Sequence, residues 1–306
     1  MSSRITNSMM SRSVLADLND VANRQAATRR QMSSGKVVNR PSDDPYAAGR
    51  ALSLRNELGG IRQHARNVDE AQSWMTITDT SLSHIGDMAQ RARELVVQGG
   101  TDTLPQTSRD AIASEIDQLI AGMKQEANVT YDGRYVLAGA RTNVPPYDAK
   151  VLPAGSAPND GYSGDAYKQM REIGPGVTLQ VNVNGDEVLG SNPGDGKMLD
   201  VLRNIATHLR SGDTASLSSS DLKGVSDQIE NLLAVRARVG AGINRLETAA
   251  SRLAETEESA TSMLSDTEDA DMAQTLIDYS TQQAVYQSAL NAGSRIVQSS
   301  LLDFLR

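Results

Sequence analysis

The sequence predicts a mainly α-helical fold with one β-rich insertion. Three observations predict it. Apolar residues recur at steps of three and four over long stretches, aromatic residues make up only 3% of the 306-residue chain, and proline and glycine crowd into 142–196. With one Trp and one Phe, the core has to be built from aliphatic side chains packed between helices. This composition favours long packed helices over a compact enzyme with a pocket.

Charge and cysteine content exclude several classes of protein. The absence of cysteine excludes disulfides and thiolate metal sites. A net charge of −8 argues against a phosphate-binding surface, so we expect no nucleic-acid partner. No run approaches the length of a membrane span, so we expect no membrane insertion. The N-terminus lacks the apolar core of a cleaved secretory signal, so export would have to use another route.

Two helices are expected before residue 100. The first spans 5–33 and ends at Gly35. The second spans about 45–98, with Asp44 as its N-cap and Pro45 at its first position.

A third helix is expected at 106–127. Its opening Thr107-x-x-Asp110 is similar to a capping box, in which side chains bond the free amides of the first turn. After it, the segment YDGRYVLAG predicts a short strand pair around Asp132-Gly133.

The segment 142–196 is interpreted as a small β-rich domain inserted into a helical body. Apolar residues alternate along it before Asn184-Gly185, a favoured hairpin turn. The alternating residues are Val177, Leu179, Val181 and Val183. This pattern predicts a hairpin that turns at Asn184-Gly185.

The strongest helical pattern runs over 220–264, after a short helix at about 196–210. Its apolar positions alternate steps of three and four through six heptads, with Arg236 among the exceptions. The acidic run at 265–271 then interrupts the pattern and fits a helix N-terminus better than a calcium loop. The predicted rod core is Leu222, Val225, Ile229, Leu232, Val239, Ile243, Leu246 and Leu253.

The last helix carries an apolar stripe whose other faces are polar. The N-terminal helix is the other amphipathic element without an obvious partner. Two such helices cannot cover both stripes, so we expect the chain ends to pair and to assemble with further copies. The predicted assembly interface is Ile5, Met9, Leu15, Leu18, Tyr279, Tyr286, Leu290, Val297, Leu301 and Phe304.

No constellation of residues predicts catalysis or a bound metal. The three histidines, His64, His84 and His208, lie in separate segments and are expected to face solvent. The segment GSNPGDGKM lacks the spacing of a phosphate-binding loop and has Met198 where Ser or Thr would hold magnesium. We therefore expect no enzyme and no cofactor.

Several stretches resemble the bacterial flagellin family. They are MSSGKVVNRPSDDPYAAGRAL at 32–52, LSHIGDMAQRARELVVQGGTDT at 82–103, GRYVLAG at 133–139 and LIDYSTQQAVYQSALNAGSRIVQSSLLDFL at the end of the chain. RPSDDPYAA, DADMAQT and the LLDFL ending are more similar to family members at the junction between hook and filament than to the filament subunit.

The resemblance implies a rod of long antiparallel helices, with terminal helices that form a coiled-coil tube on assembly. It implies three domains. The terminal assembly domain would comprise 1–40 and 266–306, the helical rod 41–141 and 197–265, and the β-rich insertion 142–196.

The resemblance also implies a structural adaptor exported by the flagellar type III apparatus to the outside of the cell. Its expected partners are hook-associated protein 1, flagellin, identical subunits in a ring, and a cytoplasmic export chaperone. Two alternatives stay open. The chain could be flagellin itself, the filament subunit, or an enzyme or ligand-binding module housed in 142–196.

Overall fold

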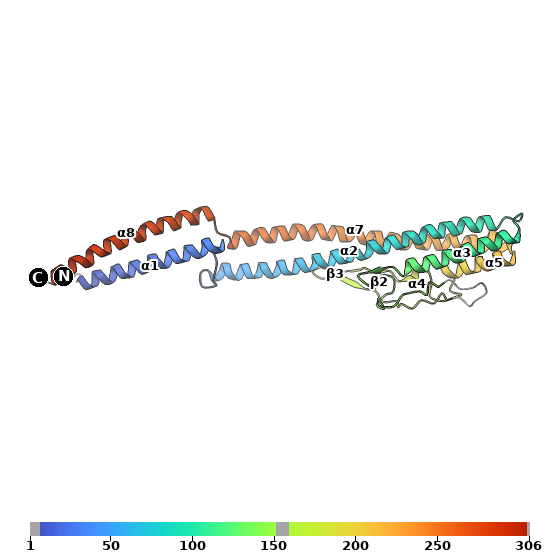
Figure 1. Ribbon diagram of the computed structural model, residues 1–306, viewed down its shortest axis with the longest axis horizontal. Helices are drawn as coiled ribbons and strands as arrows, with labels where there is room; N and C mark the ends of the chain where they lie inside the picture. Colours follow the sequence, from blue (N-terminus) through green and yellow to red (C-terminus); the bar gives the residue numbers. More distant parts are fainter. Residues whose placement is uncertain (1–6, 151–158, 305–306) are drawn as a thin grey trace. The chain divides into compact units, whose positions relative to one another are not determined.

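The computed structural model describes residues 7–150 and 159–304, and their side chains except at 7–8, 10–11 and 295–304. Six helices longer than three turns dominate it (Figure 1). They are α1 (Asn7–Ser34), α2 (Pro45–Gly99), α3 (Gln106–Ala127), α5 (Met198–Ser211), α7 (Leu222–Glu268) and α8 (Met272–Phe304). The prediction of a mainly helical fold with a small β insertion is confirmed.

The remaining elements are short. They are the strands β1 (Thr130–Tyr131), β2 (Arg134–Tyr135), β3 (Met170–Gly174) and β4 (Val177–Gln180), the helices α4 (Gly185–Val188) and α6 (Thr214–Ser216), and the π-helical turn η1 (Leu217–Asp221). β1 pairs with β2 and β3 with β4, both antiparallel. The first pair turns at Asp132-Gly133, as predicted, with both residues at positive φ.

The chain forms two compact units. Unit 1 comprises residues 1–60 and 256–306, and unit 2 comprises residues 61–255. The three predicted domains divide the chain at other positions, so that division remains a prediction.

In unit 2, α2 and α7 pack antiparallel. A Cβ atom added at Gly86 would lie 3.4 Å from Leu232, and one added at Gly242 would meet Met75. The contact on α7 therefore moves toward the C-terminus as the contact on α2 moves toward the N-terminus. At these glycines the two helices come close because no side chain separates them.

The predicted rod core lies largely on the buried face of α7. Buried are Val225, Ile229, Leu232, Val239, Leu246 and Leu253; Leu222 and Ile243 are half-buried. Between Leu232 and Val239 the buried seam passes through Val235 rather than the predicted Arg236. Arg236 lies beside the seam, where its Nε donates to Asp79 at 3.0 Å. Val235 keeps the same three-and-four spacing and has no charge to bury.

The predicted capping box of the third helix is wrong. α3 begins after Pro105, which occupies the N-cap position and offers no side-chain bond. Asp110 instead accepts a hydrogen bond from Gln106 at 2.9 Å, one turn back on the exposed side of the helix. The helix begins before Thr107, because the Pro105 carbonyl already accepts from the amides of Ser108 and Arg109 at 3.0 and 3.2 Å.

The hairpin predicted at Asn184-Gly185 is also wrong. The β3–β4 hairpin turns at Pro175-Gly176, where Gly176 adopts a φ of +70°. Asn184 is extended and serves as the N-cap of α4. Gly185 is needed for a different reason, because a Cβ there would lie 3.0 Å from the ring of Tyr147.

Candidate assembly surface

The helices α1 and α8 lie side by side in unit 1 (Figure 1). They come close at Gly293, where an added Cβ would lie 2.9 Å from Val14 and 3.9 Å from Leu18. The side chains withdrawn from solvent follow steps of four and three on both helices. On α1 this row is Val14, Leu18, Val21, Gln25, Thr28 and Met32, flanked by the half-buried Ala22, Ala26, Ala27 and Gln31; on α8 it is Thr275, Tyr279, Gln282, Tyr286, Ala289 and Gly293.

The seam between these helices mixes apolar, small and polar side chains, and further apolar side chains lie outside it. Thr28, Thr275 and Gly293 are buried in the pair. Beside Met272 at the start of α8, six apolar residues are exposed, namely Met9 and Leu15 on α1 and Leu276, Ile277, Val285 and Leu290 on α8, each 44–58% exposed. We call these six residues the outer face. These residues lie on more than one side of the helix pair, which suits contacts with more than one neighbouring chain.

The predicted interface residues divide between the seam and the outer face. Leu18, Tyr279 and Tyr286 are half-buried in the seam, whereas Met9, Leu15 and Leu290 are exposed on the outer face. Ile5 lies outside the described residues. Val297, Leu301 and Phe304 belong to the last turns of α8, but their side chains lie outside the description.

The sequence analysis missed Val14 and Val21 on α1 and Leu276 on α8. A signal for the valines exists, since Val14, Leu18 and Val21 follow the four–three spacing. Leu15 competes with Val14 for the same register, and only the packing of α8 decides between them.

The two linkers that lead to the terminal helices are joined by one buried carboxylate. The side chain of Glu268 is 6% exposed, and its Oε1 lies 2.6 Å from Lys36 Nζ. Arg55 pairs with the other carboxylate oxygen, Oε2. Around this contact the Val37 amide donates to the Glu268 carbonyl at 2.7 Å, and the Ala270 amide donates to the Gly35 carbonyl at 2.8 Å. We call this arrangement the linker clasp.

Two aspartates start the helices next to the clasp. Asp44 accepts from the amides of Tyr46 and Ala47 at 2.9 and 3.0 Å, as predicted for the N-cap of α2. Asp271 accepts from the amides of Ala273 and Gln274 at 2.9 and 3.1 Å and caps α8.

The acidic run 265–271 was predicted to belong to a helix N-terminus, and this holds only for its last residue. α7 continues to Glu268, four residues beyond the predicted end at 264. Glu268 extends the helix because its charge is neutralised by the clasp.

The insertion is fixed to the helices by buried charges in unit 2. Lys124 of α3 is 1% exposed, and its Nζ lies 2.6 Å from Asp160 Oδ1. Asp160 also accepts from Arg203 Nε of α5 at 3.0 Å. Burial lowers the pKa of Lys124. Burial opposes ionisation of Asp160 as well, but the bonds from Arg203 and Lys124 prevail and lower its pKa.

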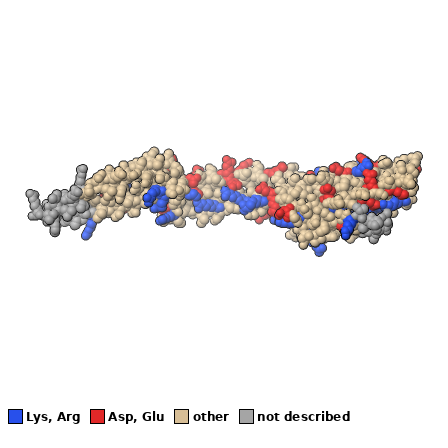
Figure 2. Space-filling model, viewed as in Figure 1, with Lys and Arg blue, Asp and Glu red and all other residues tan. Residues whose placement is uncertain are grey.

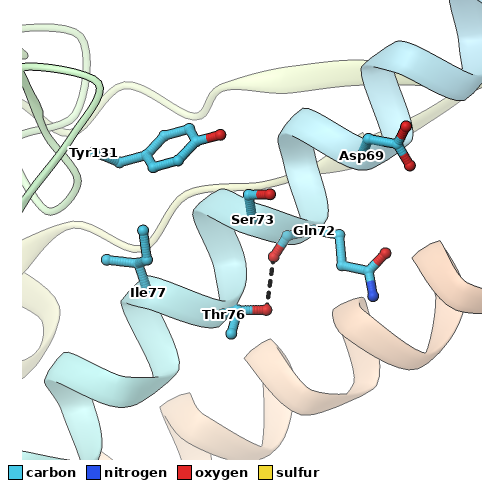
Figure 3. A pocket seen from close by; sticks show the side chains of 6 residues that line it. All are labelled: Asp69, Gln72, Ser73, Thr76, Ile77 and Tyr131. Atoms are coloured by element: carbon cyan, nitrogen blue, oxygen red, sulfur yellow. Dashed lines mark hydrogen bonds between the residues drawn. The ribbon is translucent and has the colours of Figure 1, made fainter.

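A groove of about 510 Å³ lies against α2 and is lined by Asp69, Gln72, Ser73, Thr76, Ile77 and Tyr131 (Figure 3). Thr76 donates its hydroxyl to the Gln72 carbonyl at 2.8 Å, so it is already bonded within the helix. The ring of Tyr131 packs edge-on against the ring of the buried Trp74, with 6.1 Å between the ring centroids. The lining contains a single carboxylate and no basic side chain that could activate a nucleophile.

The histidines have three different surroundings. His84 is exposed near Glu126, as predicted. His208 is partly buried, with its Nδ1 2.7 Å from Asp221 Oδ2, and His64 is half-buried. The prediction that all three face solvent is therefore wrong for the last two. His208 is drawn inward because α5 packs against η1, which carries Asp221.

Neither a metal site nor a membrane span is found among the residues that the structure describes. Among these residues, no three His, Asp or Glu side chains come together as a metal site would require. None of the described helices combines the length and apolar character of a membrane span.

Two family models match the chain at its two ends. The bacterial flagellin N-terminal helical region matches residues 5–142, and the bacterial flagellin C-terminal helical region matches residues 222–305. The chain belongs to the bacterial flagellin family. The matched segments contain the outer face, the linker clasp and the long helices α2, α3 and α7, so these are features of a flagellin-family structural protein.

Curated relatives in the flagellin family include two kinds of flagellar subunit. Flagellar hook-associated protein 3 of Escherichia coli is 27% identical over 86% of this chain and 87% of its own length. The flagellin of Bacillus subtilis is 28% identical over 95% of this chain and 97% of its own length. The chain thus spans most of both relatives.

Solved structures share the flagellin-family fold. A putative flagellar hook-associated protein from Vibrio parahaemolyticus aligns with a TM-score of 0.65, at 19% identity, over 74% of this chain and all of that one. The flagellar junction protein FlgL from Legionella pneumophila aligns with a TM-score of 0.58, at 14% identity, over 72% of this chain and 99% of that one. The chain is an extracellular component of the bacterial flagellum and not an enzyme.

Proposed function

We propose that this chain is a structural adaptor at the hook–filament junction of the flagellum, joining the hook to the flagellin filament. The outer face of α1 and α8 is the observation that carries the proposal. Six apolar side chains remain exposed there although the two helices already pack together. Burying such a face against several neighbours would stabilise an assembly.

The partners follow from a place at the junction. Hook-associated protein 1 would lie on the hook side, flagellin on the distal side, and identical subunits beside each copy in a ring. A cytoplasmic chaperone would cover the outer face before export. Relatives named hook-associated protein 3 and junction protein support this choice within the flagellin family.

The second candidate is flagellin itself, the filament subunit. The Bacillus subtilis flagellin matches this chain over a larger share than the Escherichia coli hook-associated protein does. Both candidates use the same outer face, so the fold does not separate them.

Deletion of the gene in the source bacterium separates the two. For an adaptor, the deleted cells retain hooks without filaments and release flagellin into the medium. An immunoblot for flagellin and electron micrographs of the hooks measure this, and the reintroduced gene restores filaments. Deleted cells that keep attached filaments, or that release no flagellin, would contradict the junction role.

A further inference from the structure

The two chain segments that build unit 1 carry opposite charge. Residues 21–42, in α1 and the linker to α2, contain five Lys or Arg and no Asp or Glu. Residues 256–294, in the end of α7 and most of α8, contain seven Asp or Glu and no Lys or Arg. Figure 2 shows basic side chains where α1 ends and α2 begins, and acidic ones over the last turns of α7.

Most of these charges are not used inside the subunit. Lys36, Arg55 and Glu268 neutralise one another in the linker clasp. Four exposed arginines remain in 21–42 and a fifth lies close by on α2, and none of the five has a carboxylate partner for its side chain among the residues the structure describes. These are Arg24, Arg29, Arg30, Arg40 and Arg50, and we call them the basic patch.

The opposite patch consists of exposed carboxylates. These are Glu258, Asp266, Asp269 and Asp278, which we call the acidic patch. Asp269 accepts from Ser265 and Asp278 from Gln274, both neutral donors. Within the described part of the chain, no cation pairs with any of the four.

We infer that the basic patch of one copy pairs with the acidic patch of a second copy of this chain, an inference that rests on the proposed function. The two patches are different surfaces, so each copy offers one patch to each of two neighbours. Such a contact generates a ring when its rotation closes. A twofold pair would use both patches of each copy against one partner, whereas a head-to-tail contact leaves one patch of each copy free for the next subunit.

The charges and the outer face have different tasks in this contact. Exposed ion pairs contribute little binding energy each, so the apolar outer face supplies most of the attraction. Opposite charges select the partner and its side, because wrong arrangements bring like charges together. The patches act only at short range, since salt screens them over about 8 Å at physiological ionic strength.

Charge reversal in cells that lack the native gene tests the inference. One variant carries Arg30→Glu and Arg50→Glu, and another carries Glu258→Lys and Asp266→Lys. Immunoblots of purified hook–filament structures measure how much of the chain is retained. Each variant should lose roughly tenfold in retention, since attraction turns into repulsion at every subunit contact.

The four reversals combined in one chain restore opposite patches and should recover retention to within about twofold of the parent. A matched control, Asp87→Lys with Arg93→Glu, reverses two exposed charges of unit 2 and should be retained like the parent. Full retention of either single-patch variant, or failure of the combined variant to recover, would overturn the inference. If the parent gene still restores filaments in that case, the proposed junction role stands; if it does not, the junction role fails as well.

Discussion

Glu268 shows how one side chain can hold two separate linkers. Its carboxylate is buried, whereas its partners Lys36 and Arg55 are partly exposed. The two cations bond strongly to this carboxylate because it is charged. A neutral amide in its place, as in a glutamine, would accept weaker hydrogen bonds from them. The linker clasp therefore holds together the point where α1 ends and the point where α8 begins.

We predict that Glu268→Gln loosens both linkers without unfolding unit 2. The expected loss is about 1 kcal/mol, since both cations are partly solvated. Hydrogen exchange should accelerate roughly fivefold at the amides of Val37 and Ala270, which bond across the clasp. Glu258→Gln, an exposed glutamate on α7, is the control and should leave those amides unchanged. Equal protection in both variants would show that the backbone bonds hold the linkers alone.

Asp160 gives unit 2 a dependence on acid. Its pKa is lowered in the folded state, so its stabilising contribution is present above the ordinary value near 3.8. That contribution is lost as the pH falls through the folded pKa.

We predict that Asp160→Asn lowers the melting temperature at pH 7 and flattens its fall as the pH drops below the ordinary value near 3.8. The loss at pH 7 should reach about 3 kcal/mol, because Lys124 is left buried without its carboxylate. Asp132→Asn, an exposed residue in the β1–β2 turn, should keep the acid dependence of the parent. Thermal melts at pH 7 and at a series of pH values below 4 measure both effects. A parallel fall in all three proteins would contradict the role of Asp160.

At the scale of elements, the seam of α7 against the rest of unit 2 is the most testable feature. Leu232 is 1% exposed and the adjacent Leu233 is 55% exposed. The same substitution at these two neighbours therefore compares a buried with an exposed position on one helix.

We predict that Leu232→Asp destabilises unit 2 by several kcal/mol, since it places a charge without a partner in an apolar seam. Leu233→Asp should stay within about 1 kcal/mol of the parent. Helical circular dichroism followed through a thermal melt measures both. Similar melting of the two variants would mean that the seam is not buried in the free subunit.

The elements also show what the sequence can predict. The long helices were predicted closely because two kinds of signal are local. These are the apolar spacing and the residues that start or end a helix, namely Gly35, Pro45 and Gly99-Gly100. The β3–β4 hairpin was placed wrongly because Asn184-Gly185 is a good turn in isolation. Only the tertiary contact of Gly185 with Tyr147 shows that this glycine serves close packing instead.

The sequence was enough to predict that the terminal helices carry an assembly surface, but not which residues of each helix face the partner helix. Heptad spacing identified both terminal helices, but it could not decide which of two adjacent apolar stripes faces the partner helix. The glycine contact at Val14 decides this on α1, and it leaves Leu15 outside. The linker clasp was not predicted, since Lys36 and Glu268 are far apart in the sequence and no local pattern joins them.

In the whole subunit, we expect the outer face to serve assembly and not folding. In a free subunit these apolar side chains contact solvent, so removing them should not change stability. In an assembly every copy would lose the same contact, and the effect would recur at each subunit.

The most direct test is the double variant Leu276→Asp with Leu290→Asp, whose positions are 58% and 44% exposed on α8. The control carries Val97→Asp with Leu233→Asp, which are similarly exposed in unit 2. Melting of the purified subunits and flagellin released by cells carrying each variant are measured together. We expect both variants to melt and to be exported like the parent, and flagellin to be shed into the medium only with the α8 variant. Attached filaments and normal swimming with the α8 variant, or its earlier melting as a free subunit, would contradict the claim.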